Sequence, residues 1–232
     1  MQEGSLIAEG KPAFLFDLDG TLIDSVYEHV LAWREALREL DIDLSTWRIH
    51  RRVGMSGGLI LNALQRETGR KLSNDEAERL KRLHTEAFFK RIDQVRPLPG
   101  AKELLHALTD LAVPWAIATS GKKEEAGRAI KSLDCGDRVQ LVTRDDASHG
   151  KPFPDLFLTA AERLKVSIQH CIVVGDSVWD LLASRRAHAL GVGLLCGGYG
   201  EDELYEAGAY RVYADPAELL KHVDELGVEA KV

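Results

Sequence analysis

The stretch AFLFDLDGT, residues 13–21, runs from a short apolar segment directly into two carboxylates and a glycine. An apolar segment of this length predicts a strand that is covered on both faces, as in a parallel sheet. Asp17 and Asp19 follow the end of this strand, and ligands of open α/β sheets bind at the carboxyl ends of the strands. The stretch therefore predicts a sheet with a polar site at its edge, although Asp-Gly is also typical of a simple turn.

Short apolar segments of the same kind recur along the chain and alternate with amphipathic stretches of helical period. The strand-like segments are residues 13–16, 115–118, 139–142, 171–174, 192–195 and 209–213. The helical stretches between the later ones include residues 124–133, 156–164 and 178–189. This alternation is typical of a parallel sheet with right-handed crossovers. We therefore expect an α/β fold with a doubly wound parallel sheet, similar to the Rossmann fold.

One long gap interrupts this alternation. Between the first two strand-like segments lie about a hundred residues without a convincing strand, far more than a normal connection needs. Ser73 and Glu76 form the signature of a capping box there. Apolar residues recur in the gap at spacings of four and three, which is a helical stripe: Val26, Val30, Trp33, Leu37 and Leu40. We expect an inserted α-helical cap domain over residues 25–95, with the α/β core domain formed by residues 1–24 and 96–232.

Composition narrows the possible partners. The chain has 232 residues, enough for a sizeable core, and its net charge of −7 argues against a general binder of nucleic acid. No apolar run approaches the length that spans a bilayer, and the N-terminus lacks the apolar core of a signal peptide. Three widely separated cysteines suggest neither a disulfide framework nor a zinc site. We expect a cytoplasmic monomer or homodimer that binds a small molecule, and neither nucleic acid nor a membrane.

A second acidic cluster, VVGDSVWD at residues 173–180, ends another strand-like segment. Asp176 or Ser177 could cap the helix that follows, and Asp180 could be an acid favoured in its first turn. Four carboxylates at two strand ends are nevertheless more than helix caps require. Like charges that meet at one sheet edge need a cation between them, and oxygen ligands suit Mg²⁺. The two clusters therefore predict a magnesium site.

Two further segments place polar groups at intervening strand ends. Thr119, Ser120 and Gly121 follow the second core strand, where hydroxyls and backbone N–H groups at a helix start can bind phosphate oxygens or simply cap the helix. Lys151 lies in a turn between Gly150 and Pro152. A lysine in such a turn is most often exposed to solvent. A cation near a nucleophilic carboxylate would offset the charge of both the carboxylate and a phosphate. Because hydroxyl and backbone N–H groups at a helix start can bind phosphate oxygens, Ser120 and Gly121 are candidates for substrate binding.

These four pieces, in this order, resemble the four motifs of the haloacid dehalogenase superfamily: DLDGT at 17–21, Thr119, Lys151 before Pro152, and GDSVWD at 175–180. The resemblance covers essentially the whole chain. The helical insertion is similar to the α-helical, C1-type cap of one subclass, and the nearest resemblance is to the phosphoglycolate phosphatase and β-phosphoglucomutase-like branch.

The resemblance implies a role for each motif residue. Asp17 would attack phosphorus and become an aspartyl-phosphate, while Asp19 would protonate the leaving alcohol and then activate water. Thr119 and Lys151 would hold the transferring phosphoryl group. Mg²⁺ would be held by Asp17, the backbone carbonyl of Asp19 and Asp176, with Asp180 further from the ion.

Substrate contacts in the cap are less well defined by the sequence. Arg52 lies in the basic, glycine-rich stretch RRVGMSGG at residues 51–58, which could reach over the site to a substrate or form a surface turn. His29, on the first cap helix, occupies a position that resembles one in β-phosphoglucomutase. It could bind substrate and report that binding to the catalytic acid, or it could be a buried core or interface histidine.

The expected activity is Mg²⁺-dependent hydrolysis of a small phosphorylated metabolite, such as phosphoglycolate, a sugar phosphate or a nucleotide monophosphate. A phosphosugar mutase is the first alternative, but mutases of this branch often carry Val at the position of Thr21 and a basic residue at that of Gly57. A non-catalytic receiver module with a phosphorylatable aspartate is a more remote alternative, because receivers are roughly half this length and have no cap.

Overall fold

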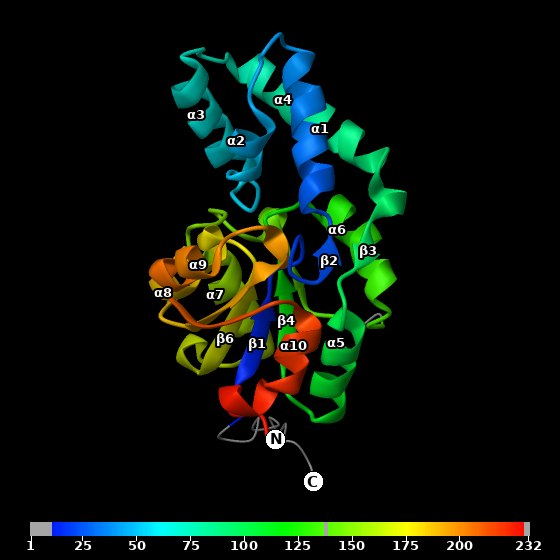
Figure 1. Cartoon of the computed structure of the whole chain (residues 1–232), viewed down its shortest axis with the longest axis vertical. Coiled ribbons are helices and arrows are strands. Elements are labelled where there is room, and N and C mark those ends of the chain that lie inside the picture. Colours follow the sequence, from blue (N-terminus) through cyan, green and yellow to red (C-terminus); the bar gives the residue numbers. More distant parts are fainter. Residues whose placement is uncertain (1–10, 137–138, 230–232) are drawn as a thin grey trace, which may run out of the picture.

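The computed structural model describes residues 11–136 and 139–229 of the chain (Figure 1). Residues 1–10 lie outside the described residues. They belong to the predicted core domain and to the N-terminus that was compared with a signal peptide. Within the described ranges, no helix is long and apolar enough to cross a membrane.

A parallel sheet of six strands forms the lower part of the molecule in Figure 1, in the order β5-β4-β1-β6-β7-β8. The strands are β1 (Ala13–Phe16), β4 (Trp115–Ala118), β5 (Leu141–Val142), β6 (Cys171–Gly175), β7 (Leu190–Leu194) and β8 (Ala209–Tyr213). The chain builds β4 and β5 on one side of β1 and the later strands on the other. The carboxyl ends of β1 and β6 therefore flank the point where the strand order reverses, which is where such sheets bind ligands.

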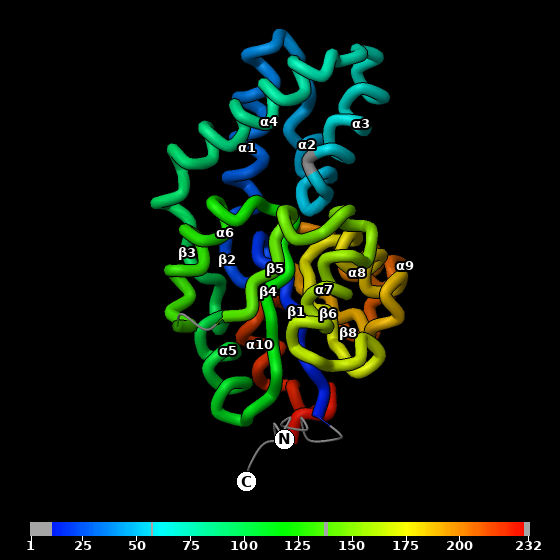
Figure 2. The backbone as a smooth tube through the Cα atoms, turned by 180° about the vertical axis from the view of Figure 1, so that it is seen from behind, coloured from blue at the N-terminus to red at the C-terminus, as the bar shows by residue number. Residues whose placement is uncertain are grey.

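Helices cover both faces of the sheet, as the front and back views show (Figures 1 and 2). Phe14 and Phe16 pack on one face against α5 (Ala101–Asp110), α6 (Lys123–Ile130) and α10 (Pro216–Lys221). Ala13 and Leu15 alternate to the other face and pack against α7 (Asp155–Leu164) and α8 (Val178–Ala187), and α9 (Glu201–Ala207) packs beside α8. The doubly wound parallel fold predicted from the sequence is confirmed.

Four helices form the cap above the carboxyl edge of the sheet (Figure 1): α1 (Val26–Arg38), α2 (Thr46–His50), α3 (Gly57–Thr68) and α4 (Asn74–Phe89). They share an apolar cluster of their own, and all five residues of the predicted stripe are buried in it. The predicted capping box is confirmed. The Ser73 hydroxyl accepts from the backbone N–H of Glu76 at 3.2 Å, and the Glu76 carboxylate accepts from the backbone N–H of Ser73 at 2.9 Å.

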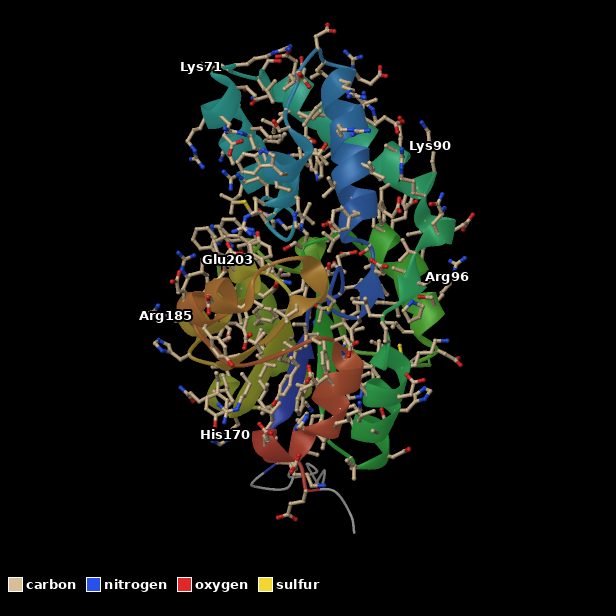
Figure 3. All side chains as sticks on the ribbon, in the orientation of Figure 1. Lys71, Lys90, Arg96, His170, Arg185 and Glu203 are labelled. Carbon is tan, nitrogen blue, oxygen red and sulfur yellow. The ribbon has the colours of Figure 1, made fainter. Side chains whose placement is uncertain are left out.

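Figure 3 shows the molecule from the cap end, marked by Lys71, to the core end, marked by His170.

Two very short strands connect the cap with the core. β2 (Ile23–Asp24) pairs antiparallel with β3 (Arg96–Pro97). The expectation that this gap contains no strand is wrong at these four residues, because segments of two residues show no alternation for a sequence pattern to report.

Some predicted boundaries also shift. β5 begins at Leu141 instead of 139, and β7 covers Leu190–Leu194 because residue 195 enters a 3₁₀ segment. α8 ends at Ala187 because His188 adopts a left-handed conformation with φ of 62°. The 3₁₀ segments are Ile92–Gln94, Lys131–Leu133, Arg144–Asp146, Ile168–His170, Leu195–Gly197 and Val223–Leu226.

Gly100, between β3 and α5, provides a test of this packing. Its φ is +75°, and a Cβ there would lie 2.3 Å from the Cα of Ala217 at the start of α10. Gly100→Ala is expected to lower the free energy of unfolding by about 2 kcal/mol or more, from left-handed strain and overpacking. Gly127→Ala is the matched control, because a Cβ inside α6 meets nothing within 4 Å. It is expected to raise stability by roughly 0.5–1 kcal/mol. Urea denaturation measures both, and equal effects would contradict this packing.

Candidate active site

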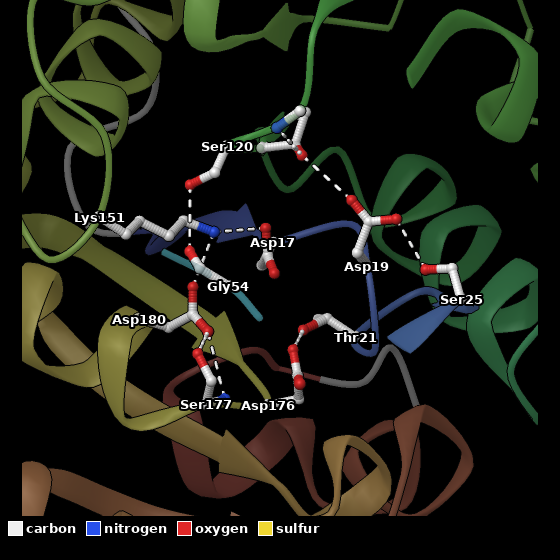
Figure 4. A network of polar contacts seen from close by, with 12 residues as sticks. Asp17, Asp19, Thr21, Ser25, Gly54, Ser120, Lys151, Asp176, Ser177 and Asp180 are labelled. Atoms are coloured by element: carbon white, nitrogen blue, oxygen red, sulfur yellow. Dashed lines mark hydrogen bonds and ion pairs between the residues drawn. The ribbon is translucent and has the colours of Figure 1, made fainter. Parts of the chain in front are cut away.

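The sheet brings polar residues from distant parts of the sequence to one edge, as Figure 4 shows. Asp17 follows β1, Thr119 follows β4 and Asp176 follows β6, while Lys151 precedes α7. Because β1 pairs directly with both β4 and β6, their carboxyl ends lie side by side. The predicted strand-end residues therefore converge on one small region.

Lys151 lies at the centre of this region and has no exposed surface. Its Nζ donates a hydrogen bond to Oδ1 of Asp17 and lies 2.7 Å from Oδ1 of Asp180 (Figure 4). Burial alone would lower the pKa of this ammonium, but the two carboxylates outweigh burial and raise it above its ordinary value. A solvated lysine in a turn, the alternative interpretation of the sequence, is therefore wrong.

Asp180 has two partners, one on each oxygen. Its Oδ2 accepts from the hydroxyl of Ser177 at 2.5 Å and from the backbone N–H of the same residue at 3.2 Å, at the start of α8. The interpretation of Ser177 and Asp180 as a helix cap is thus correct. The other oxygen of Asp180 contacts Lys151, so the same carboxylate both caps α8 and orients the buried ammonium.

Asp176 is buried beside this pair. Its Oδ1 accepts from the hydroxyl of Thr21 at 2.9 Å, and the backbone of Gly197 approaches so closely that a Cβ there would lie 1.8 Å from Oδ2. Thr21 belongs to the predicted DLDGT motif, but its contact with Asp176 was not predicted. Burial, reinforced by the charges of Asp180 and Asp17, raises the pKa of Asp176 well above its usual range.

The three buried carboxylates can hold a metal ion. One oxygen from each of Asp17, Asp176 and Asp180 lies within 4.8 Å of the others. Burial raises the pKa of Asp17 to about 7 in spite of Lys151, so one ammonium does not offset the cluster. A site made of carboxylate oxygens that lacks compensating charge suits a divalent cation such as Mg²⁺.

Asp19 faces away from this cluster, toward the cap. Its Oδ1 accepts from the Ser25 hydroxyl at 2.7 Å and lies 3.2 Å from Nε2 of His29, while Thr119 Oγ1 lies 3.4 Å from Oδ2. Burial alone would raise the pKa of Asp19, but the charge and hydrogen bond of His29 and the bond from Ser25 lower it below its ordinary value. The Asp19 side chain is therefore separate from the three carboxylates, and Ser25 is a site residue that the sequence analysis missed.

His29 extends this contact into the cap. Its Nδ1 lies 3.2 Å from Nε2 of His84 on α4, and its ring stacks on Phe88 with centroids 3.9 Å apart. Burial alone would lower the pKa of His29, but the charge of Asp19 raises it above its ordinary value, whereas burial lowers that of His84 well below it. His29 is therefore a buried histidine that also contacts Asp19. His84 was missed because it sits in the ordinary helical pattern of α4.

A cavity of about 270 Å³ lies between cap and core at this point. The predicted residues that line it are Asp17, Asp19, His29, Thr119, Ser120 and Gly121. Trp33, which like His29 resembles a cap position of β-phosphoglucomutase, also lines it. Lining residues that the sequence did not identify include Ile60, Lys81, His84, Thr85, Lys122 and Glu125. Ser120 also donates from its hydroxyl to the carbonyl of Gly54 at 3.2 Å, which joins the core to the cap loop (Figure 4).

The prediction that Arg52 contacts substrate needs correction. Its guanidinium donates to Glu67 on α3, and Arg52 is not among the residues that line the cavity. Arg51 likewise pairs with Glu203 on α9 (labelled in Figure 3) and lies 4.1 Å from the ring centre of Tyr199. Both arginines thus pair with carboxylates on helices. The part of this loop that lines the cavity is residues 53–56, which follow the arginines.

Comparisons with known proteins agree with this arrangement. Residues 11–188 match a family described as haloacid dehalogenase-like hydrolase. The crystal structure of a hydrolase from Pseudomonas syringae is 51% identical in sequence, with a TM-score of 0.92 over 94% of this chain and 100% of that one.

Two relatives carry more specific names. A phosphoglycolate phosphatase from Neisseria meningitidis is 30% identical over 82% of each chain. A β-phosphoglucomutase from Bacillus subtilis is 29% identical over 78% of this chain and 82% of its own. Both branch members named in the sequence analysis are thus among the relatives of this chain.

The raised pKa of Asp17 predicts how the stability of the metal-free protein depends on pH. Between the ordinary pKa of 3.8 and the native value of about 7, the native state binds more protons at Asp17 than the unfolded state does. The free energy of unfolding therefore falls as the pH rises through this range. Asp17→Asn is expected to flatten that slope. Urea denaturation in EDTA at pH 5 and 7 measures it, and identical slopes for the two proteins would contradict the assignment.

Proposed function

Because the chain belongs to the haloacid dehalogenase-like hydrolases, we propose that it is a Mg²⁺-dependent phosphatase that hydrolyses small phosphomonoesters through an aspartyl-phosphate on Asp17. The observation that carries this proposal is the buried Lys151, which holds Asp17 on one side and Asp180 on the other. It supplies positive charge beside a carboxylate at the carboxyl end of a central strand. Phosphoryl transfer depends chiefly on such positioning and charge stabilisation.

Asp17 is the proposed nucleophile. Its carboxylate attacks phosphorus, the bond to the leaving oxygen breaks, and an acyl-phosphate forms. Lys151 and Thr119 stabilise the negative charge of the transferring group, and Lys151 also fixes the orientation of Asp17. Water then attacks the phosphoryl group, which releases inorganic phosphate and restores the Asp17 carboxylate.

Asp19 is the proposed acid and base. In the first step it passes to the leaving alcohol a proton that it shares with protonated His29, and in the second step it takes a proton from water. The Asp19–His29 contact at 3.2 Å and the raised pKa of His29 keep a proton beside this carboxylate. Ser25 and Thr119 fix its position from two further directions.

Asp17, Asp176 and the backbone carbonyl of Asp19 are the proposed ligands of Mg²⁺. When bound, Mg²⁺ offsets the mutual repulsion of the carboxylates and the phosphate. Asp180 contributes mainly by orienting Lys151, because each of its oxygens already has a protein partner.

We further propose that residues 25–95 act as a cap domain that moves relative to the core about the paired connectors β2 and β3. The cavity between the two parts would admit substrate in an open arrangement and exclude bulk water in a closed one. We place the enzyme in the cytoplasm, where Cys135, Cys171 and Cys196, none of which forms a disulfide, would remain reduced.

Substitution of the proposed nucleophile tests the function directly. Asp17→Asn is expected to lower kcat for Mg²⁺-dependent hydrolysis of p-nitrophenyl phosphate by about a thousandfold or more, because the acyl-phosphate cannot form. Asp110→Asn, on the exposed end of α5, is the matched control and is expected to keep wild-type activity. A soluble, folded Asp17→Asn protein with wild-type kcat would overturn the proposal.

A phosphosugar mutase is the second candidate, favoured by the similarity to the Bacillus β-phosphoglucomutase. Incubation of the enzyme with β-glucose 1-phosphate and Mg²⁺ separates the two activities. A phosphatase is expected to release free phosphate with no glucose 6-phosphate, measured by a phosphate assay and a coupled dehydrogenase assay. Net formation of glucose 6-phosphate would instead identify a mutase.

A further inference from the structure

One carboxylate in the cavity has no role in the proposed reaction. Glu125 lies in the first turn of α6 and is 8% exposed, yet it lines the same cavity as Asp19 and His29. Buried carboxylates are uncommon unless they are paired, and the described part of the chain gives Glu125 no ion pair. Glu125 is therefore a candidate acceptor for a hydrogen bond from a ligand in the cavity.

The protein partners of Glu125 use only part of its capacity. Its Oε1 accepts from the Thr85 hydroxyl of the cap at 2.8 Å, and Oε2 accepts from the backbone N–H of Lys122 at 3.4 Å. An ionised carboxylate can accept about four hydrogen bonds. The Thr85 hydroxyl also lies 3.2 Å from the carbonyl of Lys81, so it has a second acceptor when another donor reaches Glu125.

Glu125 and Asp19 face the same small volume. A methyl group placed on Gly121 would contact Oε2 of Glu125 at 3.7 Å and Oδ2 of Asp19 at 3.9 Å. Asp19 meets the leaving oxygen in the proposed reaction. Glu125 is therefore placed to meet the substituents that lie next to that oxygen.

The cations around the cavity offset only part of the negative charge of Glu125 and Asp19. His29, whose pKa both carboxylates raise in spite of burial, contacts Asp19 at 3.2 Å and forms no ion pair with Glu125. Lys81 Nζ lies 2.7 Å from Glu78, and Arg144 donates to the carbonyls of Ala147 and Ser148. Lys122 is exposed at the rim, where its charge helps to lower the pKa of Glu78. A carboxylate on the leaving group would thus lie beside two buried carboxyl groups, whereas a hydroxyl would gain a hydrogen-bond acceptor in Glu125.

We propose that Glu125 determines specificity: it favours phosphomonoesters whose leaving alcohol carries neighbouring hydroxyls, such as hexitol and sugar phosphates, over those whose leaving alcohol carries a carboxylate. This inference rests on the proposed phosphatase function. A site that hydrogen-bonds a hydroxyl discriminates strongly against substrates that lack one.

The test measures kcat/KM for sorbitol 6-phosphate and for 2-phosphoglycolate, each relative to p-nitrophenyl phosphate. The wild-type enzyme is expected to prefer sorbitol 6-phosphate by about tenfold or more, and Glu125→Gln to reduce that preference by about tenfold, mainly through KM. Glu124→Gln, the same change one residue earlier at an exposed position, is expected to keep the wild-type preference.

Thr85→Val separates selectivity from a purely structural contact between cap and core. It removes a competing protein donor, so the preference for sorbitol 6-phosphate is expected to persist or to increase. Equal loss of activity on all three substrates in this variant would overturn the inference.

A wild-type preference for 2-phosphoglycolate, or an unchanged preference in an active Glu125→Gln enzyme, would also overturn the inference and leave the proposed phosphatase intact. If the wild-type enzyme with Mg²⁺ hydrolysed none of the three esters, the proposed function itself would fail.

Discussion

The site depends on a single buried ammonium, that of Lys151, held among three buried carboxylates. When all four groups are ionised, the carboxylates of Asp17, Asp176 and Asp180 exceed the ammonium by two negative charges. Buried charge without compensation is costly, and the pKa values of Asp17 and Asp176 rise accordingly. In the proposed function, a divalent cation would supply the missing compensation, and together with Lys151 it would allow this acidic edge of the sheet to receive a phosphate. The acidic net charge of the chain is therefore compatible with an anionic substrate.

The fold brings the residues of this cluster together from distant parts of the sequence. Lys151 and Asp17 are 134 residues apart in the sequence, and the folded chain brings Lys151, before α7, into contact with Asp17 at the end of β1. In the proposed reaction, the core thus supplies the charges that would act on the phosphoryl group. The cap supplies a different set of groups, led by His29, which contacts Asp19 on the side away from the carboxylates. In the proposed reaction, the leaving group would therefore lie between Asp19 and Glu125 of the core and the cap residues His29 and Thr85.

The sequence predicted those parts of the structure that depend on local pattern. Apolar segments that end in polar residues predicted that Asp17, Thr119 and Asp176 follow strands, and helical periodicity predicted the buried stripe of α1. Contacts that depend on how distant elements pack were not predictable. Thr21 donates a hydrogen bond to Asp176, 155 residues away in the sequence. Arg52 pairs with Glu67 because its loop lies beside α3. Glu125 looked like any acid in the first turn of a helix, since only the placement of the cap over α6 brings it into the cavity.

Calorimetric titration of the metal-free protein with Mg²⁺ tests the central claim most directly, because it needs no substrate. The account predicts saturable binding of one Mg²⁺ per chain to the wild-type protein. Asp176→Asn keeps the shape of the side chain but removes a charged ligand, so it is expected to weaken binding by about tenfold or more. Absence of saturable binding to the wild-type protein, or equal affinity in the variant, would contradict the claim that these carboxylates form a divalent-cation site.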